Sequence, residues 1–148
     1  RDEAKVTLYG VPDKPGSSAK IFSALAKAGV NVDMIVQASS READKANLVF
    51  TCTDRDSPFA RETLEKLKAD VGYERLEVTR DVSKISIIGV GMKSHTGVAE
   101  KMFTALSEKG INIDVISTSE IKISVLIAAP YTELAVRALH TAFGLDSE

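Results

Sequence analysis

Hydrophobic and polar positions along the first half of the chain follow two periods, and each period predicts a different kind of element. Apolar residues at every second position predict strands, and apolar residues three to four apart predict helices. The strands are expected at residues 5–10, 30–38, 46–52 and 74–80. One helix is expected at residues 16–28, with Pro15 in its first turn and Gly29 at its end, and another follows Ser57-Pro58, a favourable N-cap pair. The order βαββαβ is that of a ferredoxin-like α+β domain.

The second half of the chain has the same order of elements but ends early. A strand is expected at residues 84–90, a helix at 97–109, further strands at 111–118 and 121–127, and a last helix from Pro130. Residues 144–148 are too few and too polar to form a closing strand. The second copy is therefore βαββα. Its sheet either keeps an open edge or is completed by a segment outside this chain. The second alternative is considered because proteins usually cover such an edge.

Each predicted helix carries one apolar face, which we expect to be buried. In the first helix of the chain this face is formed by Ala19, Ile21, Phe22, Leu25 and Ala28. In the second helix it is formed by Ala60, Leu64, Leu67 and Val71, and in the last helix by Tyr131, Leu134, Ala135, Ala138, Leu139 and Ala142.

The two halves are copies of one domain. Residues 6–39 align with residues 87–120 without a gap at an offset of 81, and ten of the 34 paired positions are identical. The identical pairs include Gly10/Gly91, Gly16/Gly97, Gly29/Gly110, Asn31/Asn112, Asp33/Asp114 and Ile35/Ile116. A repeat of this length is too long for a solenoid unit, so we place two domains at residues 1–81 and 82–148.

Composition excludes several classes of protein. The net charge is −2 without a basic block, which argues against a nucleic-acid groove, and the 5% aromatic content argues against an RNA-binding sheet of the same topology. A single cysteine, Cys52, excludes a disulfide framework and fits a reducing cytoplasm. No apolar run reaches the roughly 20 residues of a membrane span. The chain begins with Arg1 rather than Met, which is typical of a trimmed or processed product.

Catalytic and metal-binding patterns are weak in this sequence. It contains no GxxxxGK(S/T) phosphate loop and no GxGxxG after a strand, and its two histidines lack the spacing of a metal site. His140 lies beside an apolar stripe and is expected to be structural, whereas His95 lies in a loop before a helix and is either a solvated residue or part of a site. Cys52 is expected to be an inert thiol in the core.

Two loop clusters, whose glycines recur at the repeat offset, are the candidate binding elements. Residues 13–18 and 93–98 each place a glycine, Gly16 or Gly97, at the start of a helix. Free backbone N–H groups and the positive end of the helix dipole attract a carboxylate or phosphate there, and glycine allows a close approach. A loop that only needs a tight turn explains the same residues, and the sequence leaves that alternative open.

Polar residues at the start of the second strand of each copy suggest what else is bound. Asn31 and Asp33 alternate with aliphatic residues, as do Asn112 and Asp114, and residues 117–120 add hydroxyls and a second carboxylate. A helix N-terminus for a carboxylate together with Asn and Asp for an ammonium group describes an amino-acid pocket. A basic side chain such as that of lysine would be served by Glu120 or Asp114.

At these residues the chain resembles the regulatory half of aspartokinase, which is built of two ACT domains. The matching stretches are KVTLYGVPDKPGSSAKIF (5–22), NVDMIVQASS (31–40), VGMKSHTGVAEKMF (90–103) and NIDVISTSEIKISVLI (112–127). The resemblance implies feedback inhibition by lysine, threonine or both in the biosynthesis of the aspartate family of amino acids. It also implies effector binding at ACT-domain interfaces of a homodimer, and a segment upstream of this chain that completes the second domain.

The resemblance also implies two effector pockets. One would use Asp13, Pro15, Gly16, Ser17, Ser18 and Gln37, closed by Asn112, Ile113 and Asp114 of a second chain. The other would use Met92, Ser94, His95, Gly97, Val98, Asp114, Ser119 and Glu120. No catalytic residue and no cofactor are implied for this chain, because ATP and Mg²⁺ would belong to an absent kinase domain. The chain alone should therefore show no kinase activity.

Several alternatives stay open at this point. The chain resembles both a separate small subunit and a piece of the whole enzyme, and the sequence does not separate them. Which effector binds is equally open. A dimerisation module without effector binding of its own is the alternative to the regulatory module, and a small enzyme on the same fold is disfavoured because no nucleophile and base are paired.

Overall fold

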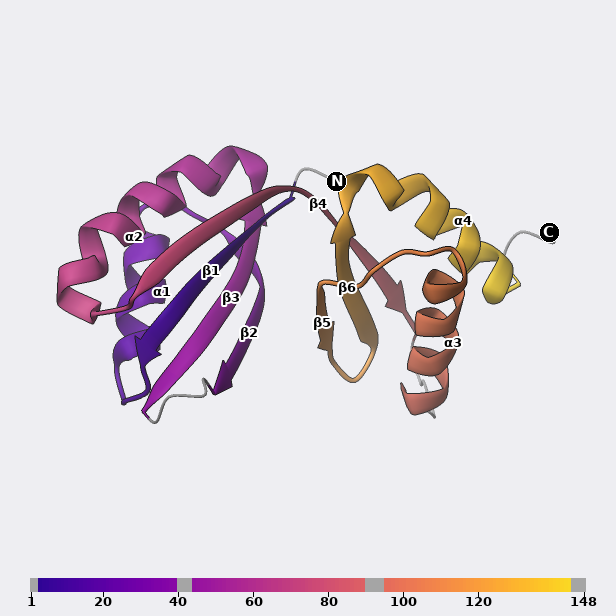
Figure 1. Cartoon of the computed structure of the whole chain (residues 1–148), viewed down its shortest axis with the longest axis horizontal. Helices are drawn as coiled ribbons and strands as arrows, with labels where there is room; N and C mark the ends of the chain where they lie inside the picture. The colour runs from indigo at the N-terminus through magenta and orange to yellow at the C-terminus, as the bar shows by residue number, and fades with distance from the viewer. Residues whose placement is uncertain (1–2, 40–43, 90–94, 145–148) are drawn as a thin grey trace. The chain divides into compact units, whose positions relative to one another are not determined.

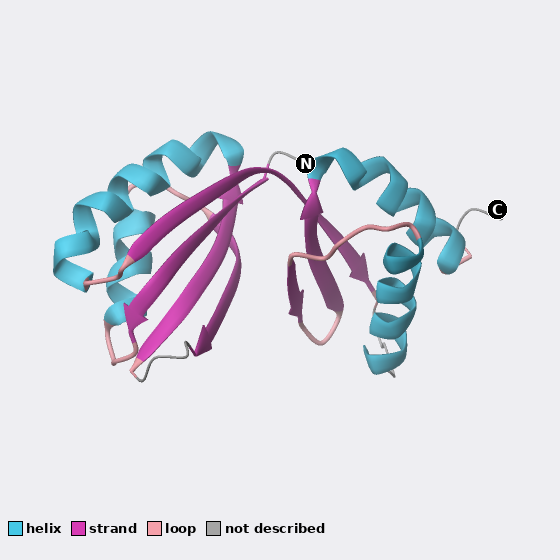
Figure 2. Ribbon diagram, viewed as in Figure 1, coloured by secondary structure: helices cyan, strands magenta, loops and turns pink. Residues whose placement is uncertain are grey.

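A computed structural model describes residues 3–39, 44–89 and 95–144 of the chain. The chain separates into two units, residues 2–80 and residues 81–148 (Figure 1). Each unit combines strands with two helices, as the colouring by secondary structure shows (Figure 2). The tandem of two ferredoxin-like α+β units predicted from the hydrophobic pattern is confirmed. The two units are described one at a time.

The first unit has the predicted βαββαβ order. Its strands lie in the order β2-β3-β1-β4, and both helices cover one face of the sheet (Figure 1). The strands β1–β3 are Glu3–Pro12, Val32–Ser39 and Lys45–Thr53, and α1 and α2 are Ser17–Lys27 and Ser57–Val71. The short 3₁₀ turn η1 (Asp54–Asp56) joins β3 to α2, and β4 begins at Arg75.

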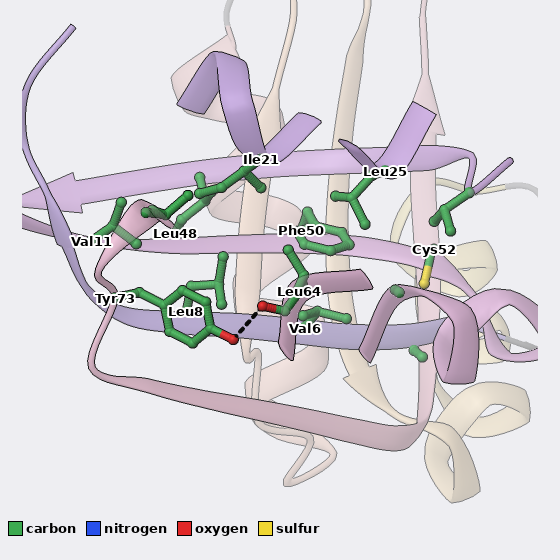
Figure 3. Close-up of a cluster of buried hydrophobic side chains, with 14 residues drawn as sticks. Val6, Leu8, Val11, Ile21, Leu25, Leu48, Phe50, Cys52, Leu64 and Tyr73 are labelled. Carbon is green, nitrogen blue, oxygen red and sulfur yellow. Dashed lines mark hydrogen bonds between the residues drawn. The ribbon is translucent and has the colours of Figure 1, made fainter. Parts of the chain in front are cut away.

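The core of the first unit lies between this sheet and the helices (Figure 3). Alternate residues of β1 and β3, among them Leu8 and Phe50, face Ile21, Leu25 and Leu64 from the helices. All five side chains are fully buried. The phenol of Tyr73 donates a 2.7 Å hydrogen bond to the backbone carbonyl of Leu64, which satisfies both groups inside the core (Figure 3). Cys52 is buried as expected.

The helix ends also follow from the sequence, with two corrections. Gly29 ends α1 in a Schellman turn, in which its own N–H bonds to Ala26 and the N–H of Val30 bonds to Leu25. Ala19 is exposed, contrary to prediction, because it lies two residues before Ile21 and therefore about 200° away around the helix. Ala28 is exposed as well, because it caps the end of α1.

The beginnings of α1 and α2 differ from the prediction by one or two residues. Pro15 lies before the N-cap residue Gly16 rather than in the first turn of α1. Ser57 is the first residue of α2 rather than its N-cap, because the 3₁₀ turn η1 already winds the chain before it. The hydroxyl of Ser57 donates to the carbonyl of Asp54 at 2.8 Å within that turn.

The strands predicted at residues 74–80 and 84–90 are one continuous strand, β4 (Arg75–Ile88). Asp81 lies in its middle with a φ of 61°, a left-handed conformation that aspartate tolerates better than most residues. The apolar positions change parity across it, because Leu76 and Val78 pack on the first core whereas Ile85 and Ile87 pack on the second. Because one residue, Asp81, leaves the extended conformation, a single strand can contribute apolar side chains to the cores of both units.

The second unit has the strand order β4-β6-β5 and two helices. Its elements are α3 (His95–Glu108), β5 (Val115–Thr118), β6 (Lys122–Ala128), the 3₁₀ turn η2 (Ala129–Tyr131) and α4 (Thr132–Ala142). Its buried core contains Met102, Leu106, Ile111, Ile123, Val125, Ile127, Ala135 and Leu139.

Three predicted boundaries in this unit are wrong. The strand predicted from residue 111 begins only at Val115, because the N–H of Ile111 bonds to Leu106 in the turn that ends α3. The last helix begins after η2, so Tyr131 is outside it and 44% exposed. Ile121 is also exposed, since it lies in the turn between β5 and β6 rather than on the buried face of β6.

No strand follows α4 among the described residues, which end at Gly144. A groove of about 470 Å³ lies along β4 and α4, lined by apolar side chains that include Ile85, Ile87 and Leu139. In the first unit, Leu76 and Val78 of β4 pack against the corresponding core. The second unit therefore lacks its own fourth strand in the described part of the chain, and what completes it stays a prediction.

Candidate functional site

The first candidate cluster lies in the turn from β1 to α1. Gly16 is the N-cap of α1 with a φ of 95°, a conformation that favours glycine, and open space lies where a Cβ would be. Its carbonyl accepts from the N–H of Lys20 at 3.0 Å, and the N–H of Ser17 bonds to the carbonyl of Lys14 at 3.3 Å. The N–H of Asp13 donates to the carbonyl of Asp44 at 2.7 Å. These bonds hold the loop against the sheet and leave residues 13–16 exposed.

A small cavity of about 30 Å³ lies behind this loop. Its lining residues come from the loop, from α1 and from strands β1, β2 and β3, and they are Val11, Pro12, Asp13, Lys14, Ser17, Ser18, Gln37, Ala46 and Leu48. Four of the six residues predicted for the first pocket are among them, namely Asp13, Ser17, Ser18 and Gln37. Pro15 and Gly16 shape the turn but do not line the cavity.

Polar groups of this cavity come from both of its sides. Ser18 on α1 donates its hydroxyl hydrogen to Oε1 of Gln37 on β2 at 3.2 Å. Ser17 is only 6% exposed, and its hydroxyl has no hydrogen bond to any of the described residues. Asp13 and Lys14 place a carboxylate and an ammonium group at the exposed rim. The arrangement thus offers donors and acceptors for a zwitterion.

Sequence reasoning missed five residues of the cavity, and some of them left a signal. Lys14 lies inside the predicted loop between Asp13 and Pro15, and its charge was a signal that could have identified it. Ala46 and Leu48 follow the alternation of β3, so their burial was predictable. Their contact with the loop was not, because it depends on the register of β3 between β1 and β2.

The second candidate cluster is only partly described by the structure. Met92 and Ser94 lie outside the described residues, and His95 is the first residue of α3. Gly97 and Val98 lie in the first turn of α3, which begins two residues before the predicted start at residue 97. The second copy therefore does not repeat the glycine N-cap of the first. The residue before the glycine also differs, because it is Pro15 in the first copy and Thr96 in the second.

The remaining predicted residues of the second half lie at two places. Ser119 and Glu120 are exposed in the turn between β5 and β6, where the N–H of Ser119 donates to the carbonyl of Lys122 at 2.8 Å. Asn112 and Ile113 line an open concavity of about 470 Å³ after α3. Asp114 follows them and is exposed, and its N–H donates to the carbonyl of Leu126 at 2.8 Å. The described residues do not bring all of these side chains together in one cavity.

Groups capable of other chemistry do not form a second centre. Burial raises the pKa of the Cys52 thiol to about 11, so the thiolate is disfavoured near neutral pH. Within residues 3–39, 44–89 and 95–144, no group of three or more His, Cys, Asp or Glu side chains is arranged to hold a metal ion. No helix in the described part of the chain combines the length and the hydrophobicity needed to cross a bilayer.

Two repeated ferredoxin-like units define a protein of two ACT domains. A model of the ACT domain matches residues 5–71, and a second ACT-domain model matches residues 85–143. An aspartokinase of Mycolicibacterium smegmatis is 49% identical over 149 residues, which cover 100% of this chain and 35% of that protein.

Solved structures give the same result at the level of the regulatory subunit. The ligand-free regulatory subunit of aspartate kinase from Thermus thermophilus is 44% identical with a TM-score of 0.87, over 96% of this chain and 93% of that one. A chain from a structure of aspartokinase alpha and beta subunits is 43% identical with a TM-score of 0.88, over 97% and 93% of the two chains. The chain belongs to the aspartokinase family, as its regulatory region of two ACT domains. It spans about a third, 35%, of the length of the M. smegmatis enzyme.

Proposed function

We propose that this regulatory region binds lysine, threonine or both, and that binding inhibits an aspartokinase catalytic domain or subunit. The observation that carries the proposal is the cavity between the loop before α1 and strand β2. It combines the N-terminus of a helix with a carboxylate, an ammonium group, two hydroxyls and an amide, and it contains no catalytic pair. These are the groups that recognise the ends of a free amino acid.

The chemistry of the cavity assigns a role to each group. The N-terminus of α1, with the positive end of the helix dipole, attracts the ligand carboxylate, assisted by Lys14. Asp13 accepts from the ligand ammonium in a charge-assisted hydrogen bond. The hydroxyl of Ser17, which has no partner among the described residues, and the amide of Gln37 remain to select the ligand side chain.

The size of the cavity supports a site that is completed by a second chain. Its volume of about 30 Å³ is well below the roughly 300 Å³ at which ligand pockets usually begin. Nearby, β2 is an edge strand of the sheet, and its residue Ile35 is 52% exposed. β5 has the same position in the second unit, where the repeat partner Ile116 is 45% exposed. Two such apolar edges favour pairing with another copy.

Regulation then follows from linkage. An effector that binds one packing of the paired chains more tightly than another shifts the population toward that packing, and by reciprocity the packing changes effector affinity. If the favoured packing holds the catalytic part inactive, the end product inhibits its own synthesis. In this account ATP, Mg²⁺ and all bond-making chemistry belong to the catalytic part, and the regulatory region needs no cofactor.

A thermal-shift panel of the twenty amino acids tests this proposal. A ligand present at about 100 times its Kd stabilises the folded chain by about 2.7 kcal/mol, so lysine, threonine or their mixture should raise the Tm by several degrees. The other amino acids serve as matched controls for ionic and osmotic effects. An equal Tm in all twenty solutions, at millimolar concentration, would refute effector binding by this chain.

The exposed edges of β2 and β5 support a second candidate, a dimerisation module without effector binding. Sedimentation velocity separates it from the first. The regulatory module predicts that effector changes the dimer fraction or the sedimentation coefficient of the dimer. The dimerisation module predicts identical sedimentation with and without amino acids.

A further inference from the structure

The hydrogen bond between Ser18 and Gln37 joins α1 to β2 beside the cavity of the first unit. The Ser18 hydroxyl donates to Oε1 of Gln37 at 3.2 Å, and both side chains line the cavity. Ser17, which is 6% exposed, lines the same cavity with a hydroxyl that makes no hydrogen bond within the described residues. The cavity thus has one hydroxyl, that of Ser18, whose hydrogen bond links the helix side to the strand side.

We propose that Ser18 is a positioning residue that holds this cavity closed by occupying the amide oxygen of Gln37. The inference rests on the proposed function, because the ligand that has to displace Ser18 is the amino-acid effector. In the ligand-free chain Gln37 is held toward α1. In the bound chain Gln37 would be released from Ser18, and its oxygen would accept from the ligand instead.

Replacing the Ser18 hydroxyl by the effector as the donor to Gln37 is favourable, but breaking the Ser18 bond lowers the apparent affinity for the effector. The Ser18 bond joins two neutral groups, as a bond from a threonine hydroxyl to Gln37 would, whereas the side-chain ammonium of lysine forms a charge-assisted bond that is about twice as strong. The effector therefore displaces the hydroxyl, but its apparent affinity is lowered by the fraction of chains that are closed. Removing the hydroxyl removes this competition and leaves Gln37 in place.

The second copy of the repeat cannot form this bond. At the offset of 81 the counterparts of Ser18 and Gln37 are Ala99 and Thr118, and alanine has no hydroxyl to donate. Ala99 instead packs against the core of the second unit. The closing bond is thus a feature of the first pocket alone, so the two copies respond to effector through different local equilibria.

Ser18→Ala tests the proposal, with Ser23→Ala as the matched control. Ser23 is an exposed serine of the same helix that does not line the cavity. We expect the Kd of whichever of lysine and threonine binds the wild-type chain to fall about 2- to 10-fold in Ser18→Ala, the range expected for loss of one competing hydrogen bond. Ser23→Ala should bind like the wild type.

A ligand-free measurement makes the test independent of the effector. The side-chain ¹⁵N–¹H resonances of Gln37 should shift in Ser18→Ala and stay unchanged in Ser23→Ala. Unshifted Gln37 resonances would overturn the inference whatever the effector does. An equal or higher Kd in Ser18→Ala, with binding by the wild type intact, would overturn it and leave the proposed function standing. Loss of all binding by wild type and both variants would instead overturn the proposed function, and the inference with it.

Discussion

The guanidinium of Arg80 donates two hydrogen bonds to the carboxylate of Asp54, from Nε to Oδ1 at 2.6 Å and from Nη2 to Oδ2 at 2.8 Å. The pair joins β4, at the last residue of the first unit, to the turn that follows β3. These hydrogen bonds hold the pKa of the Asp54 carboxyl below its ordinary value. Arg80 also immediately precedes Asp81, the residue at which β4 leaves the extended conformation.

We expect Asp54→Asn to lower the Tm at pH 7 and to have no effect in acid. Because the pKa of Asp54 is lower in the folded chain, the pair stabilises the fold above the unfolded pKa of about 3.9, and this stabilisation is lost as the pH falls through the folded pKa. Thermal unfolding at pH 7 and at about pH 2 measures the difference. Asp70→Asn is the control, since the single 3.5 Å contact of Asp70 with Lys20 is more exposed. Equal Tm values of Asp54→Asn and wild type at pH 7 would contradict this.

Asp81 should tolerate glycine but not a β-branched residue. Its φ of 61° costs a non-glycine residue about 1–2 kcal/mol, and aspartate offsets part of that cost through local hydrogen bonding. Asp81→Val should therefore destabilise the chain by about 1–2 kcal/mol in urea unfolding, whereas Asp81→Gly should match or exceed the wild type. A valine variant as stable as the glycine variant would show that the left-handed conformation is not required there.

Tyr73→Phe should destabilise the first unit by about 1–2 kcal/mol, because it leaves the buried carbonyl of Leu64 without its donor. The aromatic ring and its packing are retained, so the change isolates the hydroxyl. Urea unfolding followed by circular dichroism gives the value. Tyr131→Phe is the control, since Tyr131 is 44% exposed. Equal losses in the two variants would argue against the hydrogen bond as the cause.

Ile35→Lys should prevent association of two chains without unfolding either. Ile35 is 52% exposed on β2, the last strand in its order, and a lysine there places like charges opposite each other in a symmetric pair. Sedimentation equilibrium should show a dimer for the wild type and a monomer for the variant, with unchanged circular dichroism. Val36→Lys, one position along the same strand and on its opposite face, is the comparison. A dimeric Ile35→Lys chain would place the interface elsewhere.

Much of the fold could be predicted from the sequence, because local rules determine it. Alternation located β1 and β3, the spacing of Leu64 and Val71 located the buried face of α2, and Gly29 located the end of α1. The errors occur where the extent of one element depends on its packing against other elements. The single strand β4 could not be predicted from residues 75–88 alone. The positive φ at Asp81 depends on packing against two separate cores, which the local sequence does not reveal.

The candidate site shows the same division. The loop of Asp13 and Gly16 was predictable, because a glycine before a helix has a clear local meaning. The contribution of Ala46 and Leu48 to the cavity was not, since it depends on strand register. Gly97 was misplaced because the repeat was assumed to preserve the helix start, whereas α3 begins two residues earlier, at His95.

Isothermal titration calorimetry of the chain with lysine and threonine, alone and mixed, tests the central claim most directly. We predict saturable heat with at least one of them, and an affinity at least about tenfold weaker in Asp13→Asn, which keeps the shape of the side chain but loses the charge that pairs with an ammonium group. Asp70→Asn, an exposed aspartate of α2 away from the cavity, should bind like the wild type. The absence of heat with either amino acid or their mixture, at millimolar concentration, would contradict the account.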